Sequence, residues 1–148
     1  MTQGKVNLKI VGDRLQLMED CLVSLRALPV SSLKEFTSDV RNPAAAESLL
    51  RRAIQAIFDT LKHLLSKIHG RGLLEYKQQA LLAAEQGIIR DPTLAEVLLK
   101  LGGFRNRLTH FYDEVTAEEL YDILKNKLGD LEAISEELRQ AAARAADV

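Results

Sequence analysis

One short segment of the chain carries side chains that could act on a phosphodiester. Residues 102–116 read GGFRNRLTHFYDEVT. The side chain of a histidine such as His110 can give or take a proton during a reaction, which suits attack by a ribose 2′-hydroxyl on the adjacent phosphate. Arg105 offers a fork of donors for non-bridging phosphate oxygens and for charge that develops during reaction. With Asn106 orienting either partner, this segment predicts RNA cleavage that needs no metal.

The spacing of these residues limits how they can meet. On an ideal helix of about 100° per residue, Arg105 and Tyr112 lie almost one above the other, whereas Arg105 and His110 diverge by about 140°. His110 can join Arg105 if the helix opens before it, and the cap expected at Thr116 requires the helix to end nearby. A symmetric dimer is the other possibility, because a second chain would supply the complementary group.

Purely structural interpretations of the same segment are also open. A histidine beside an arginine at a helix end is most often a C-terminal cap, and Tyr112 could be an amphipathic lid. Gly102 and Gly103 each cost about 1 kcal/mol relative to alanine inside a helix. Such a pair indicates a tight helix crossing or a bend.

The remaining residues do not suggest a metal site or a cofactor. His63 and His69 are six positions apart, and the single cysteine, Cys21, is remote from both. This spacing does not match a zinc ligand set, and one cysteine cannot form an intrachain disulfide. We therefore expect neither a metal nor a cofactor.

Charge is unevenly distributed along the chain. The net charge is −1, from 20 basic and 21 acidic residues. The balances are 0 over residues 1–50, +5 over 51–112 (10 basic, 5 acidic) and −6 over 113–148 (4 basic, 10 acidic). The middle could meet RNA phosphates, although solvated helix faces would give the same pattern. Its candidates for the RNA backbone are Arg107, Lys100, Arg71 and Lys77.

Length and composition favour one globular domain over residues 1–148. The 148 residues are 47% hydrophobic and 28% charged, which is typical of neither disordered nor membrane-spanning chains. No apolar run approaches the roughly 20 residues that cross a bilayer. The start, MTQGKVNLK, lacks the features of a signal peptide, so we expect a cytoplasmic protein with no membrane partner.

Helical periodicity runs through almost the whole sequence and predicts an all-α fold. A first helix is expected from about residue 6 to 28, followed by a short turn capped by Ser32 and Glu35. Asn42 and Pro43 are expected to open a long helix that ends at Gly70. Its apolar seam steps by three and four through Leu50, Ile54, Ile57, Leu61, Leu64 and Ile68.

The second half predicts three more helices. One is expected over residues 74–86, ending at Gly87, and one starts at Asp91 and Pro92. A capping box at Thr116 and Glu119 opens the last, which runs through Leu138, and residues 140–148 are expected to fray. The expected architecture is an up-and-down bundle of about five helices.

The octamer RNRLTHFY, Arg105 to Tyr112, resembles a known motif. It fits the Arg, any four, His, any one, Tyr pattern of the HepT-like proteins, a branch of the HEPN superfamily of small all-helical ribonucleases. The stretches GFRNRLTHFYDEV, LLEYKQQALLAAEQGII and RRAIQAIFDTLKHLL are also similar to family segments, so the resemblance covers about residues 6–138. Two departures are Arg51, where members often carry Glu, and Thr109, where an aliphatic residue is more usual.

The resemblance implies a homodimeric toxin of a type VII-like toxin–antitoxin system, with an RNA-cutting cleft along the dimer interface. Arg105 and His110 would be catalytic. The antitoxin would be a minimal nucleotidyltransferase that inhibits the toxin by transferring AMP to Tyr112, next to Arg105. The alternative is a non-catalytic HEPN partner, or substrate-binding module, of a nucleotidyltransferase.

Overall fold

The computed structural model describes residues 5–69, 75–110 and 114–146, and within these ranges the chain is helical, with no strand. The prediction of an all-α fold is confirmed. The described residues form seven helices: α1 (Leu8–Arg26), α2 (Leu33–Thr37), α3 (Arg41–His69), α4 (Tyr76–Glu85), α5 (Pro92–His110), α6 (Ala117–Asn126) and α7 (Leu128–Ala146).

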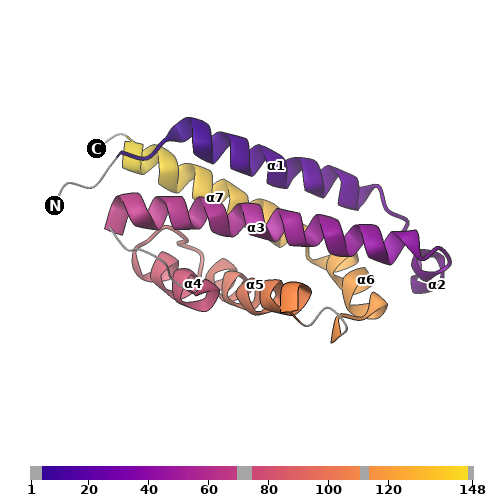
Figure 1. Ribbon diagram of the computed structural model, residues 1–148. Helices are drawn as coiled ribbons and strands as arrows, with labels where there is room; N and C mark the ends of the chain where they lie inside the picture. The colour runs from indigo at the N-terminus through magenta and orange to yellow at the C-terminus, as the bar shows by residue number, and fades with distance from the viewer. Residues whose placement is uncertain (1–4, 70–74, 111–113, 147–148) are drawn as a thin grey trace.

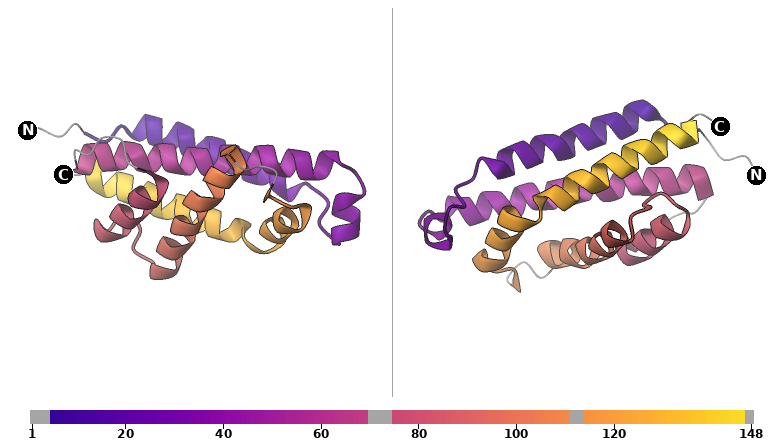
Figure 2. Two further views of the ribbon diagram at one scale, coloured as in Figure 1. Left: turned by 60° about the horizontal axis from the view of Figure 1, so that its bottom comes forward. Right: turned by 180° about the vertical axis from the view of Figure 1, so that it is seen from behind.

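Three long helices, α1, α3 and α7, lie side by side along the molecule, and α4 and α5 pack as a pair against α3 (Figure 1). Following the chain, α1, α3, α5 and α7 alternate in direction, which is an up-and-down order. α5 crosses α3 obliquely rather than along its axis (Figure 2). The start of α1 and the end of α7 lie at the same end of the bundle (Figure 1).

The apolar seams predicted from the sequence form the core. On α1 the buried residues include Leu15, Met18 and Leu25, and on α3 the expected seam is fully buried from Leu50 to Leu64. Burying one side chain of this size stabilises the fold by about 1.5–3 kcal/mol relative to leaving it exposed to water. The two seams therefore account for much of the packing of α1 on α3. Among the described residues, no helix is long and apolar enough to cross a membrane.

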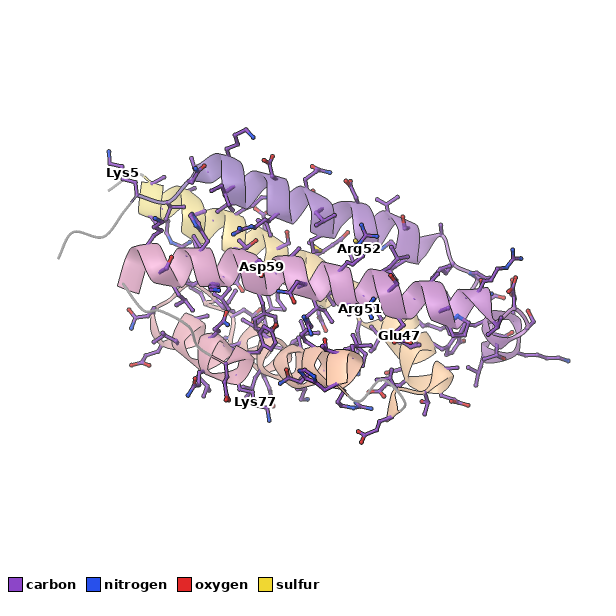
Figure 3. The ribbon with its side chains drawn as sticks, in the orientation of Figure 1. Lys5, Glu47, Arg51, Arg52, Asp59 and Lys77 are labelled. Carbon is purple, nitrogen blue, oxygen red and sulfur yellow. The ribbon has the colours of Figure 1, made fainter. Side chains whose placement is uncertain are left out.

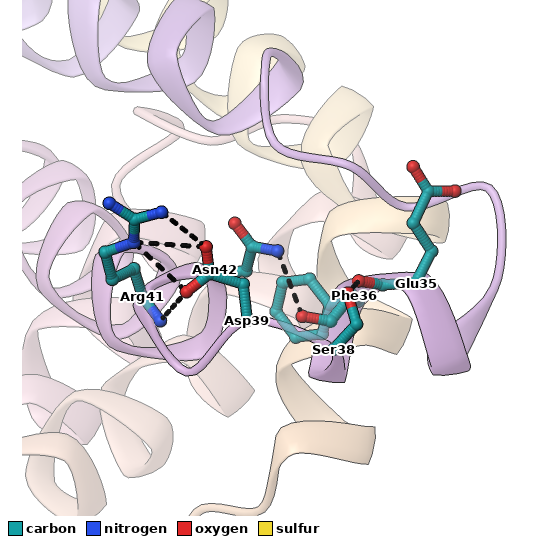
Figure 4. A network of polar contacts seen from close by, with 6 residues as sticks. All are labelled: Glu35, Phe36, Ser38, Asp39, Arg41 and Asn42. Carbon is teal, nitrogen blue, oxygen red and sulfur yellow. Dashed lines mark hydrogen bonds and ion pairs between the residues drawn. The ribbon is translucent and has the colours of Figure 1, made fainter.

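The junction of α2 and α3 differs from the prediction. Ser32 caps α2 as expected, because its hydroxyl accepts from the Glu35 N–H at 3.0 Å. Asn42, however, does not cap α3: it lies inside the helix and donates from its side chain to the Phe36 carbonyl (Figure 4). Asp39 takes that role, since its carboxylate accepts from the Arg41 N–H at 2.9 Å. The prediction failed because a carboxylate three residues earlier also caps well.

The described residues form seven helices rather than the five expected. The last predicted helix is two, because α6 ends at Asn126 and α7 begins at Leu128. α2 also counts as a full short helix. Fraying after residue 140 is not what the structure has, since α7 continues to Ala146 and buries Ala141 and Ala142. These small side chains belong to the hydrophobic core.

Two glycines in the second half have distinct structural roles. Gly87 has a φ of 72°, the left-handed conformation predicted for the residue that follows α4. Gly102 lies where α5 crosses α4, and a Cβ built there would be 3.0 Å from the Cβ of Tyr76. Gly102 therefore marks a tight helix crossing, one of the interpretations left open by the sequence for the pair Gly102–Gly103.

Candidate active site

Arg105 is held in place where α5 crosses α3 and α4. Its Nε donates to Oε1 of Gln55 at 2.7 Å, and its guanidinium carbon lies 5.4 Å from the centre of the Tyr76 ring. The Tyr76 hydroxyl donates to the same Gln55 oxygen at 3.4 Å, and its ring packs on Phe58 with centroids 4.8 Å apart. Since both the edge and the face of the guanidinium are in contact, its direction is well defined.

Gln55 is in turn oriented from α3. Its Nε2 donates to Oδ1 of Asp59, one helical turn further on, at 2.7 Å. This bond fixes which end of the amide faces Arg105, so that the oxygen accepts and the nitrogen donates. In Figure 3 Asp59 and Arg51 mark the stretch of α3 that lies over α4 and α5, and Lys77 marks α4. Two side chains of α3 thus position Arg105: Gln55 accepts its hydrogen bond, and Asp59 holds Gln55.

His110 is the last residue of α5 and is exposed. Because α5 is helical through His110, the helix does not open before it, and the first way to bring it beside Arg105 is not used. Helical geometry places the two side chains about 140° apart around the α5 axis. Within one chain the two residues therefore lie on different sides of α5.

Asn106 lies on the wall of a polar cavity of about 400 Å³ between α3, α4 and α5. Gln55 and Tyr76, the two residues that contact Arg105, also line it. The exposed Asn106 side chain therefore shares a cavity with two residues that contact the arginine, and its supporting role stays a prediction.

The described basic candidates for the RNA backbone differ in whether they are already paired within the chain. Lys77, Lys100 and Arg107 line one larger, mostly apolar cavity of about 680 Å³. The Arg107 guanidinium is already bound within the chain: it donates to both carboxylate oxygens of Glu119, at 2.6 and 2.8 Å, and to the Glu114 carbonyl. The hydrogen bond with Glu119 also raises the pKa of Arg107. Lys77 and Lys100 are exposed, so they are the better candidates for contact with RNA.

Two of the predicted site residues, Tyr112 and Arg71, lie outside the described residues. Within the described part of the chain, no cluster of histidine, cysteine and carboxylate side chains has the arrangement of a metal site. His63 instead accepts a hydrogen bond at Nε2 from the Asn7 N–H, at 3.1 Å, and burial lowers its pKa.

The sequence did not reveal Gln55, Tyr76 and Asp59 as part of the site. Gln55 and Asp59 are separated by one turn of α3, which places them on one face of that helix, but any amphipathic helix has such pairs. What selects them is the crossing of α5 over α3, some 50 residues away in sequence, and no local pattern encodes that contact.

Comparisons with known proteins place the chain in a family. The model of the family described as ribonuclease HepT-like matches residues 18–138. A curated relative, the tRNA nuclease HepT of Aphanizomenon flos-aquae (strain 2012/KM1/D3), is 30% identical over 113 residues, which is 76% of each chain.

Solved structures share the fold. A tri-AMPylated Shewanella oneidensis HEPN toxin in complex with MNT antitoxin matches with a TM-score of 0.78 and 19% identity, over 88% of this chain and 97% of that one. The cytosolic protein of unknown function YutE from Bacillus subtilis matches with a TM-score of 0.77 and 18% identity, over 97% and 96%. With the family model covering the Arg105–His110 segment and most of the bundle around it, the chain belongs to the ribonuclease HepT-like family.

Proposed function

We propose that this protein is a metal-independent endoribonuclease, the toxin of a toxin–antitoxin pair, acting as a homodimer in the cytoplasm and built as one domain. The observation that carries the proposal is the state of Arg105. Among the described residues, its guanidinium is hydrogen-bonded through Nε alone, so both terminal amino groups are available to a ligand. An arginine held by one edge and open at the other suits a phosphate.

The chemistry follows from the two motif side chains. A neutral His110 accepts the proton of a ribose 2′-hydroxyl, and the resulting oxygen attacks the adjacent phosphorus. The bond to the 5′-oxygen breaks, that oxygen takes a proton from solvent water, and a 2′,3′-cyclic phosphate remains. Arg105 binds the non-bridging oxygens, whose charge grows as the bond forms, and Asn106 supports the 2′-hydroxyl.

The cleft is proposed to lie across a dimer interface. In one chain α5 points Arg105 and His110 in directions about 140° apart, so one chain alone cannot direct both at one phosphate. Two-fold pairing of the α5 ends would place the arginine of one copy beside the histidine of the other.

We further propose that a minimal nucleotidyltransferase antitoxin silences the enzyme by transferring AMP to Tyr112. Support comes from the solved relative, an AMPylated HEPN toxin bound to MNT antitoxin. Tyr112 follows the last residue of α5 by two positions. A phosphate on its hydroxyl would compete with RNA for Arg105 through charge and hydrogen bonding.

The test is cleavage of RNA in EDTA by the purified protein, after intact-mass analysis has shown it free of AMP. Transfer RNA is the first substrate, because a relative is named a tRNA nuclease. We expect wild type to cut and to leave a cyclic phosphate. His110→Ala and Arg105→Ala should each lose at least about a hundredfold in rate, given the usual contribution of a general acid or base.

Lys9→Ala, on the exposed surface of α1, is the matched control and should cut like wild type. If an unmodified wild-type dimer fails to cut any RNA, the alternative function, a non-catalytic partner of a nucleotidyltransferase, takes the place of this one.

A further inference from the structure

We propose that the polar cavity beside Arg105 binds a guanine base of the RNA, an inference that rests on the proposed function. This cavity, here called the base pocket, is lined by side chains of α3, α4 and α5 and by the residue before α4: Gln55, Phe58, Asp59, Lys62, Glu75, Tyr76, Gln79 and Asn106. Its volume of about 400 Å³ is enough for one nucleoside.

The base pocket adjoins the phosphate position directly. Gln55 accepts from Arg105 on one side and lines the base pocket on the other. Tyr76 has the Arg105 guanidinium against its ring and also forms part of the wall. A nucleotide whose phosphate binds Arg105 would therefore have its own or a neighbouring base within reach of the base pocket.

The base pocket has an apolar surface on which a base can lie. The Tyr76 and Phe58 rings pack at a 53° angle, with centroids 4.8 Å apart, and both line the cavity. Phe58 is buried and supports the half-buried Tyr76, so the Tyr76 ring supplies the apolar contact for a base. Stacking or edge contact of a base with aromatic rings is a general means of binding single-stranded RNA.

The polar side chains select among the bases. Asp59 and Lys62 are three positions apart on α3, so a hydrogen-bond acceptor and a donor stand side by side on one wall. Among the described residues, Oδ2 of Asp59 has no hydrogen bond, and Lys62 and Asp59 form no ion pair with each other.

Guanine fits this wall better than the other bases do. Its Watson–Crick edge presents O6, an acceptor for the Lys62 ammonium, next to N1–H and N2–H₂, two donors for the Asp59 carboxylate. Uracil offers the carboxylate one donor only. Adenine and cytosine place a donor where the ammonium lies, and a ring nitrogen acceptor where the carboxylate lies.

The experiment uses RNA that cannot be cut. Fluorescence anisotropy would measure binding of labelled, uniformly 2′-O-methylated hexacytidine in which one central base is guanine, hypoxanthine or adenine. We expect the guanine hexamer to bind about tenfold more tightly than the other two. Hypoxanthine lacks the 2-amino group that the Asp59 carboxylate would bind, and adenine places a donor where the Lys62 ammonium lies. This comparison needs no protein variant.

A pair of protein variants assigns the preference to the base pocket. Asp59→Asn keeps an oxygen for Gln55 but loses the charge, and it should lose the preference for guanine over hypoxanthine. Asp20→Asn, on the exposed surface of α1, should keep it. Equal or absent binding of all three hexamers overturns the base pocket.

Failure of the base pocket and failure of the proposed function give different results. Wild-type protein that cuts RNA but binds the three hexamers equally overturns the base pocket alone. Protein that prefers guanine but never cuts overturns the nuclease and leaves the base pocket standing.

Discussion

Gln55 is a hydrogen-bond partner that several side chains around Arg105 share. The oxygen of Gln55 accepts from both Arg105 and Tyr76, and its nitrogen is anchored on Asp59. The neutral amide of Gln55 lies between the Arg105 guanidinium and the Asp59 carboxylate. Arg105 therefore does not form an ion pair with Asp59 and can bind a phosphate. Gln55 is therefore a positioning residue.

Gln55→Leu should lower the single-turnover cleavage rate about tenfold to a hundredfold, since displacing a catalytic group by about 1 Å costs that much. RNA affinity should change less, because the arginine is still present. Gln55→Glu retains an acceptor, but its charge would pair with Arg105 and face the Asp59 carboxylate, so it should also cut slowly. A Gln55→Leu protein that is folded by circular dichroism and cuts at the wild-type rate would contradict a positioning role.

A second single-residue prediction concerns pH. His63 accepts the Asn7 N–H at the start of α1, and burial lowers its pKa, with Arg14 and Lys67 adding to the effect. The unfolded chain therefore binds a proton at this residue more readily than the folded chain does. The free energy of unfolding should fall as pH drops through about 6.5 and level off below the folded pKa.

Urea unfolding at pH 7.5, 6.5 and 5.5 would measure this. In His63→Gln the amide oxygen can accept the same N–H but does not titrate, so its stability should depend less on pH. Parallel curves for wild type and His63→Gln would show that His63 is not the group responsible.

At the scale of helices, the crossing of α4 and α5 determines the site. Because Gly102 has no side chain, the backbones of α4 and α5 approach closely, and a Cβ built there would be 3.0 Å from the Cβ of Tyr76. This close approach brings the Tyr76 ring against the Arg105 guanidinium. Gly103, the next residue, faces only the flexible end of Lys77, 3.8 Å from a built Cβ. The two adjacent glycines thus differ in what they permit.

Alanine at these two positions should have opposite effects on stability. Gly102→Ala overpacks the crossing at a cost of about 1–3 kcal/mol, from which a gain in helix propensity of about 1 kcal/mol is subtracted. Gly103→Ala has room and should stabilise by up to about 1 kcal/mol. Urea unfolding of both variants would compare them, and stabilisation by Gly102→Ala would contradict the tight crossing.

Much of the helical arrangement could be read from the sequence, and the errors have local causes. Seams on α1 and α3 were predicted because leucine and isoleucine recur at helical spacing and then pack together. The break at Lys127 was missed because neither Gly nor Pro stands there. Arg105, Asn106 and His110 are predicted from their residue types, whereas Gln55 and Tyr76 come beside Arg105 only through packing of distant helices.

For the whole molecule, the direction of α5 gives a prediction about pairs of chains. If each cleft takes Arg105 from one copy and His110 from the other, Arg105→Ala and His110→Ala proteins should complement each other. Random mixing yields about half mixed dimers, each with one intact cleft of two, so about a quarter of wild-type activity should return. The chains would be mixed by unfolding and refolding together, with each variant refolded alone as control. No recovery would show that each cleft belongs to one chain.

The packing of α7 against both α1 and α3 bears on when this protein can become active. Of the described helices, α7 is synthesised last, and its buried Leu131, Ile134 and Leu138 complete the core that α1 and α3 begin. While α7 is still inside the ribosome, the nascent bundle lacks one of its three long helices. A chain proposed to cut RNA would thus complete this core only once α7 has left the ribosome, after α1 to α6 have already emerged.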